Sequence, residues 1–165
     1  MTRFQLAQLN IAHLKYAIDS PHLHDFVANI ERINILAEQA PGFCWRYITP
    51  AGDTSEAEIF GADTIVNVSV WEDIPSLHNY VYRSAHVDIM KRRKEWFNHT
   101  QDAYSVLWWV PENHQPPLQE AKQRLTMLQA LGPSADAFTF KKAFSSPNQD
   151  NLIDSELPNG LLRCD

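Results

Sequence analysis

Four segments of the chain alternate between hydrophobic and polar residues, or are rich in aromatic side chains, as β-strands are. In the first segment, Leu9 and Ile11 fall on one face of the expected strand, whereas Gln8 and Asn10 fall on the other. The predicted strands cover residues 4–14, 43–48, 64–72 and 104–110.

Three further segments have the hydrophobic spacing and the end signals of helices. The first begins at Asp19-Ser20-Pro21, where a capping residue precedes proline, and ends before Pro41-Gly42. The second begins at Asp73 and runs to about residue 97, with a bend near 83–84. The third follows Pro116-Pro117 and stops at Gly132-Pro133, with one hydrophobic face formed by Leu118, Ala121, Leu125 and Leu128. Residues 50–63 are predicted to be a loop, and Phe138, Phe140 and Phe144 to dock onto the domain.

The resulting element order, βαββαβ followed by a helix, predicts an α+β fold of the ferredoxin-like type with a four-stranded antiparallel sheet. Residues 1–144 form one predicted domain, including the added C-terminal helix, and residues 145–165 form a polar tail. Two helices cover one face of such a sheet. We expect a second subunit to cover the other face, which predicts a homodimer with its sheets packed face to face.

Polar side chains gather on one face of the third predicted strand. Asn67, Ser69 and Trp71 share that face, because side chains alternate along a strand, and Asn10 lies on the neighbouring central strand. If these faces coincide, a small polar group lies in the middle of the sheet under the helices. Buried amides need hydrogen-bond partners, which are either each other and the nearby backbone or a bound ligand.

The second helix carries His86 and Arg93 on an otherwise hydrophobic stripe with Met90 and Phe97. A histidine there can exchange protons near neutral pH or ligate iron, and an arginine can hold an anionic oxygen. The alternative is that both residues serve packing. Arg83 and Ser84 lie at the predicted bend, and the candidate pocket walls are Tyr82, Trp96, Trp45 and Trp109. Trp108 and Trp109 are adjacent on one strand, so we expect one to face the helices and the other a subunit interface.

Composition excludes several classes of protein. All five glycines among the 165 residues are isolated, which excludes glycine-rich nucleotide loops, and two cysteines make no disulfide framework. A net charge of -6 argues against nucleic-acid binding, and the basic run 91–94 is either a solvated helix face or a contact for an anionic group. No apolar run is long enough for a bilayer and no secretion signal is visible, so we expect a cytoplasmic protein without a membrane partner.

Several motifs together resemble an uncharacterised bacterial family, a domain of unknown function, over roughly residues 4–140. These motifs are Ala7-Gln8-Leu9-Asn10-Ile11-Ala12, Gly42-Phe43-Cys44-Trp45-Arg46, Asn67-Val68-Ser69-Val70-Trp71-Glu72, Tyr82-Arg83-Ser84-Ala85-His86, Arg92-Arg93-Lys94-Glu95-Trp96-Phe97 and Trp108-Trp109-Val110-Pro111. A wider similarity is to the dimeric α/β-barrel superfamily, which includes the antibiotic-biosynthesis monooxygenases. Pro41-Gly42-Phe43 with Trp45 resembles the segment that enters the second strand in that group.

This wider resemblance implies a cofactor-independent monooxygenase that acts on a small aromatic or polyphenolic molecule. Asn67 with Trp71 resembles the Asn and Trp pair of such enzymes, and Arg83 or Arg93 the arginine on their following helix. The expected catalytic residues are therefore Asn67, Trp71, His86, Arg83 and Arg93, with no cofactor. Other superfamily members bind haem through a histidine on the second helix, which makes haem binding by His86 the alternative. A non-catalytic dimer that carries a hydrophobic ligand is the third hypothesis.

Overall fold

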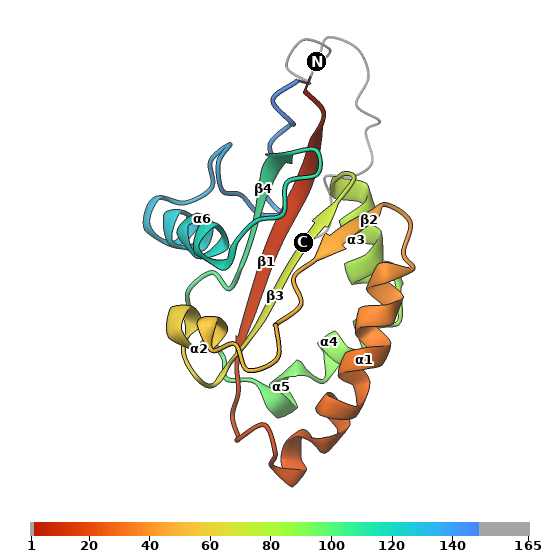
Figure 1. Cartoon of the computed structure of the whole chain (residues 1–165), viewed down its shortest axis with the longest axis vertical. Helices are drawn as coiled ribbons and strands as arrows, with labels where there is room; N and C mark the ends of the chain where they lie inside the picture. The colour runs from red at the N-terminus through yellow and green to blue at the C-terminus, as the bar shows by residue number, and fades with distance from the viewer. Residues whose placement is uncertain (1, 149–165) are drawn as a thin grey trace.

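The fold is built on one antiparallel sheet of four strands (Figure 1). In the computed structural model, which describes residues 2–148, the strand order is β2-β3-β1-β4. The strands are β1 (Phe4–His13), β2 (Phe43–Arg46), β3 (Thr64–Trp71) and β4 (Ser105–Pro111). This order, with β1 and β3 in the centre, confirms the predicted ferredoxin-like βαββαβ arrangement.

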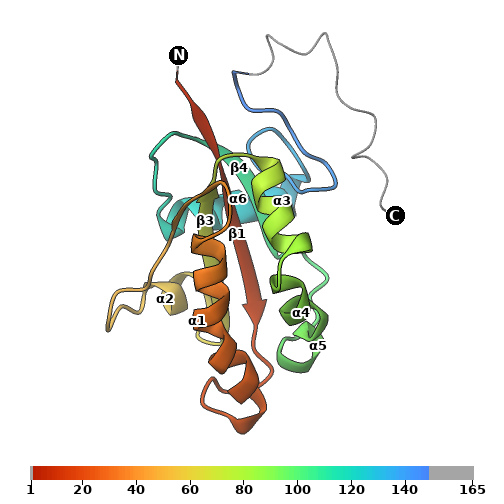
Figure 2. The same ribbon diagram turned by 90° about the vertical axis from the view of Figure 1, so that its right-hand side faces the viewer.

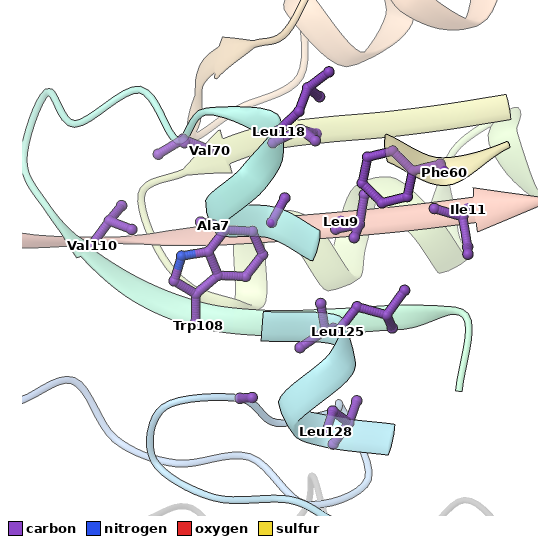
Figure 3. Close-up of a cluster of buried hydrophobic side chains, with 14 residues drawn as sticks. Ala7, Leu9, Ile11, Phe60, Val70, Trp108, Val110, Leu118, Leu125 and Leu128 are labelled. Carbon is purple, nitrogen blue, oxygen red and sulfur yellow. The ribbon is translucent and has the colours of Figure 1, made fainter. Parts of the chain in front are cut away.

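One face of the sheet is sealed by helices of the same chain, α2 (Ser55–Phe60) and α6 (Leu118–Leu131). Leu118, Ala121, Leu125 and Leu128 all point into this core, as their spacing predicted. Figure 3 shows Leu118, Leu125 and Leu128 around Trp108 and the hydrophobic residues of β1 and β3, and Trp108 is 0% exposed. A second subunit is therefore not needed to bury this face, which corrects the premise of the face-to-face dimer. Trp108 belongs to the interior of the chain rather than to an interface.

The opposite face carries two series of helices that lie side by side (Figure 2). A 3-10 turn (Pro21–Leu23) leads into α1 (His24–Glu38), and the turn is capped by the Ser20 side chain. The second series is α3 (Ile74–Arg83), α4 (His86–Lys91) and α5 (Arg93–Trp96). The predicted bend lies at Ser84, where the backbone is extended, and a further break at Arg92 divides the remainder.

A glycine brings the edge strand close to the second helical series. Gly42, immediately before β2, has φ of +81°, and a Cβ at that position would lie 2.2 Å from the Ser76 hydroxyl oxygen on α3. The Gly42 carbonyl also accepts a hydrogen bond of 2.7 Å from the Glu72 N–H. Only a residue without a side chain fits here, so this glycine sets how β2, β3 and α3 meet.

Two predictions from the sequence are altered or lie outside the structure. The segment 50–63 was predicted to be a loop, but Ser55–Phe60 form α2, whose Phe60 is buried in the α6-side core. Of the predicted tail 145–165, residues from 149 onward lie outside the described residues. Among residues 2–148, no helix has the length and hydrophobicity needed to cross a bilayer.

Candidate functional site

A cavity of about 590 Å³ lies between the sheet and the helices α1, α3 and α4. Hydrophobic clusters close this side of the sheet at both ends: Leu6, Trp71, Leu77 and Phe138 at one, Leu14, Leu23, Phe26 and Trp96 at the other. Between them the strands present the polar side chains of Gln8, Asn10, Asn67 and Ser69. The register pairs Gln8 with Ser69 and Asn10 with Asn67, so the predicted coincidence of the two polar faces is present.

Ser69 is the centre of the polar group on the strands. Its hydroxyl oxygen accepts hydrogen bonds from Gln8 Nε2 and from Trp71 Nε1, both at 2.9 Å. The Trp71 N–H is therefore engaged within the protein. Phe43 contacts the Trp71 ring edge to face and Tyr80 stacks on it, and Trp71 is only 1% exposed. Trp71 thus acts on the cavity mainly as a fixed wall that orients Ser69.

Three asparagine amides line the cavity without a protein partner. Asn10 on β1, Asn34 on α1 and Asn67 on β3 make no side-chain hydrogen bond to any other residue in the range 2–148. An amide offers two N–H donors and one acceptor oxygen, so these groups can bind either kind of ligand atom. Of the two explanations weighed for Asn10 and Asn67, mutual hydrogen bonding is not seen, and contact with cavity solvent or a ligand remains.

His86 lies at the start of α4, and its ring lines the same cavity. Its Nδ1 is 3.4 Å from the Val81 carbonyl oxygen, which can only accept a hydrogen bond, so Nδ1 carries the proton. Burial lowers the pKa of His86 below its ordinary value, and the Val81 contact opposes this in part. The imidazole is therefore neutral at pH 7, and its Nε2 carries a lone pair that can accept a proton or ligate a metal.

An aromatic series connects His86 to the strands. The rings of Tyr80 and His86 are 5.1 Å apart, and those of Trp71 and Tyr80 are also 5.1 Å apart and stacked. The Tyr80 hydroxyl donates to the Ile33 carbonyl oxygen at 3.2 Å, and burial raises the Tyr80 pKa to about 12. Tyr80 is therefore a neutral, anchored wall rather than a proton donor in the physiological range.

The arginine that lines the cavity is not one of the two that were predicted. Arg83 is exposed and Arg93 lies over the Tyr104 ring at 4.3 Å, and neither lines the cavity. Arg46 on β2 does line it, with its Nε 2.6 Å from Glu38 Oε1. The break at Arg92 explains the placement of Arg93, because one straight helix is needed to keep it on the side of His86 and Met90. The motif that contains Arg46 was visible in the sequence. Its position on an edge strand did not indicate that the Arg46 side chain faces the cavity.

Of the four aromatic residues predicted to form walls of the pocket, one lines the cavity and three do not. Tyr82 lines the cavity, although its side chain is 52% exposed. Trp96 is buried in the cluster around Phe26, and Trp45 packs against the α6-side core. Trp109 donates its indole N–H to the Phe144 carbonyl oxygen at 2.8 Å and lies beside Phe138, outside the cavity. These three tryptophans therefore stabilise the walls behind the site instead of touching its contents.

The basic run 91–94 contacts other protein groups. Arg92 forms ion pairs with Glu95 at 2.8 Å and with Asp25 on α1 at 3.0 Å, and Lys91 lies 3.9 Å from Asp88. Carboxylates beside these cations favour the interpretation of the run as a solvated helix face.

The described part of the chain holds no group of three His, Cys, Asp or Glu side chains that could bind a metal ion together. Haem requires fewer protein ligands than a bare metal ion, because one neutral imidazole is a sufficient axial ligand for its iron. His86 Nε2 fits that requirement, and Arg46 and Lys141 at the cavity could face carboxylates of such a ligand.

The strand order and the cavity together define an α+β protein of the ferredoxin-like type with a ligand-sized space between its sheet and its helices. The chain belongs to the family DUF3291, a domain of unknown function, whose model matches residues 5–154. No curated protein is detectably similar in sequence.

Two solved structures are similar to this chain at low identity. One is SnoaB, a cofactor-independent oxygenase from Streptomyces nogalater, with 14% identity, a TM-score of 0.43, and coverage of 68% of this chain and 97% of that one. The other is a protein of unknown function from Nitrosomonas europaea, with 11% identity, a TM-score of 0.45, and coverage of 71% and 97%. The assignment of the fold rests on the sheet order of the chain itself.

Proposed function

We propose that this protein is a cofactor-independent, monooxygenase-like enzyme that acts on a small aromatic or polyphenolic molecule held between sheet and helices. The observation that carries the proposal is the neutral His86, which lines the cavity and whose Nε2 forms no hydrogen bond within residues 2–148, beside three asparagine amides that also have no partner there. A base of this kind can remove the proton of a phenol or an enol, and the resulting anion is electron-rich enough to reduce oxygen.

The proposed reaction converts a ring methylene beside a phenol or enol into a carbonyl. Two C–H bonds are broken, one oxygen atom of O₂ becomes the carbonyl oxygen, and the other leaves as water with the two hydrogens. His86 Nε2 accepts the first proton, and the amides of Asn67 and Asn10 donate hydrogen bonds to the oxygen that gains negative charge. Trp71 and Tyr80 supply flat walls for the ring. Arg46, an arginine that lines the cavity, takes the place proposed for Arg83 or Arg93.

The test uses anthrone, a tricyclic ketone in equilibrium with its phenolic enol, and an oxygen electrode. Wild-type protein should consume one O₂ per anthrone, and ¹⁸O₂ should label the new carbonyl. His86→Ala should lower the rate about 10²–10⁴-fold, the usual effect of losing a positioned base. His99→Ala, which changes an exposed histidine, is the matched control and should keep the wild-type rate.

Absence of enzyme-dependent oxygen uptake, or an unchanged rate in His86→Ala, would contradict the proposal. Binding of anthrone without turnover would favour the non-catalytic ligand-binding protein instead. Haem binding is the second candidate, favoured by the Nε2 of His86, which forms no hydrogen bond within the described residues. A homodimer stays a prediction, and light scattering decides it.

A further inference from the structure

The hydroxyl of Ser69 has only one hydrogen-bonding direction left for a ligand. A serine hydroxyl has one donor and two acceptor positions. Gln8 Nε2 and Trp71 Nε1 both contact the Ser69 oxygen at 2.9 Å, and each of these nitrogens can only donate. Both acceptor positions are thereby used, so the Ser69 O–H must point to an acceptor elsewhere. No such acceptor is found among residues 2–148, and Ser69 lines the cavity.

The surroundings hold this arrangement in place. Gln8 lies directly across from Ser69 in the pairing of β1 with β3, and Trp71 lies two residues further along the same strand face. The Trp71 indole is fixed between Phe43 and Tyr80. Within residues 2–148, no charged side chain forms a hydrogen bond with Gln8, Ser69 or Trp71, so the group as a whole is neutral and suits an uncharged ligand atom.

We infer that the ligand of this cavity is a flat ring compound that presents a carbonyl oxygen, as in an aryl ketone or a quinone, to the hydroxyl of Ser69. Gln8 and Trp71 are positioning residues, because they set the Ser69 hydroxyl as a donor without touching the ligand through their N–H groups. The inference rests on the proposed function only in placing the ligand in this cavity, and it requires no turnover.

The experiment compares two probes of equal shape by isothermal titration calorimetry. They are 6-hydroxy-1-tetralone and 5,6,7,8-tetrahydro-2-naphthol, the same bicyclic phenol without the carbonyl. Wild-type protein should bind the ketone about tenfold more tightly, which is the effect of one well-placed hydrogen bond.

Two variants deprive the ligand of the Ser69 hydrogen-bond donor in different ways. Ser69→Ala removes the donor. Gln8→Glu keeps the hydroxyl but supplies a carboxylate, which accepts a hydrogen bond from the Ser69 O–H and so turns this donor away from the ligand. In both variants the preference for the ketone should fall to about twofold or less. Gln123→Glu makes the same substitution on the exposed side of α6 and should keep the tenfold preference. Near-ultraviolet circular dichroism checks that each variant is folded.

Equal binding of the two probes by wild-type protein, no binding of either, or a preference that survives both variants would overturn the inference. A role of Ser69 in structure alone would weaken both probes equally, which is also a contrary result. The oxygen-uptake assay separates this inference from the proposed enzyme. Ketone preference without turnover refutes the enzyme and supports the inference, whereas turnover without ketone preference refutes the inference alone.

Discussion

The two faces of the sheet use the same strands for different purposes. Towards α6, the strands contribute a cluster of buried hydrophobic side chains, and Trp108 donates its N–H to Glu120 Oε1 at 2.9 Å. Towards α1 and α3, hydrophobic clusters close only the ends, and the middle is polar and hollow. There the buried indole of Trp71 donates to Ser69 at the cavity wall.

We assign stabilisation of the fold to the α6 face of the sheet and the proposed ligand binding to the opposite face. Burial of hydrophobic area on the α6 face supplies much of the favourable free energy of folding. The asparagine amides that line the cavity contribute little to the free energy of folding. They form no hydrogen bond within residues 2–148, and they stay in contact with the solvent of the cavity. The polar middle of this face is therefore the basis of the proposed ligand site.

The largest expected effect concerns Trp108. Trp108→Ala removes the largest buried side chain of the α6 face and should lower the free energy of unfolding by about 3–5 kcal/mol. Urea unfolding followed by circular dichroism measures it. Asn67→Ala, at the exposed middle of the opposite face, should change the same quantity by less than about 0.5 kcal/mol. Equal losses in the two variants would remove the distinction between the faces.

A smaller effect of opposite sign is expected when the hollow face is made hydrophobic. Asn67→Leu should leave the free energy of unfolding unchanged or raise it by about 0.5–1 kcal/mol, while weakening 6-hydroxy-1-tetralone binding. The physical reason is that leucine fills cavity space and removes an amide that has no partner within residues 2–148. A loss of stability on this substitution would show that Asn67 serves the fold.

A pH effect comes from His86. Burial lowers its pKa in the folded protein below that of the unfolded chain, so between these two values only the unfolded chain binds the proton. Stability should therefore fall as the pH drops below about 6.5. His86→Gln removes this contribution, and its free energy of unfolding should fall less between pH 7 and pH 5 than that of wild type. His99→Gln should keep the wild-type dependence; identical slopes for all three proteins would contradict the burial of His86.

The smallest expected effect is spectroscopic. If the hollow face holds an oxygenase substrate, added haemin should give no Soret shift that depends on His86. A Soret band that forms with wild-type protein and disappears in His86→Ala would reassign the cavity to haem.

Local patterns were sufficient for much of this architecture. The two-residue alternation placed Asn10, Asn67, Ser69 and Trp71 on one side, because adjacent antiparallel strands share their faces. The hydrophobic stripe of α6 was visible as well, but its docking partner was not, since spacing along one helix does not say which sheet face it meets. For this reason a second subunit was expected on the face of the sheet that α2 and α6 of the same chain cover.

Other features could not be predicted from the sequence, because they depend on contacts between segments that are distant in the chain. Ser55–Phe60 is too short for a clear helical period, and it forms where Phe60 can enter the α6-side core. Arg93 shared a stripe with His86 only on the assumption of a continuous helix, which the break at Arg92 removes. Arg46 reaches the cavity from an edge strand and is held by Glu38 of α1, a pairing that no sequence spacing specifies.

The most direct test of the account observes the indole N–H signals of both faces during one titration. In ¹⁵N-labelled protein, with signals assigned through Trp71→Phe and Trp108→Phe, 6-hydroxy-1-tetralone should shift the Trp71 Nε1–H resonance and leave that of Trp108 in place. A shift confined to Trp108, equal shifts of both, or no shift of Trp71 at saturation would contradict a ligand site on the α1 and α3 face of the sheet.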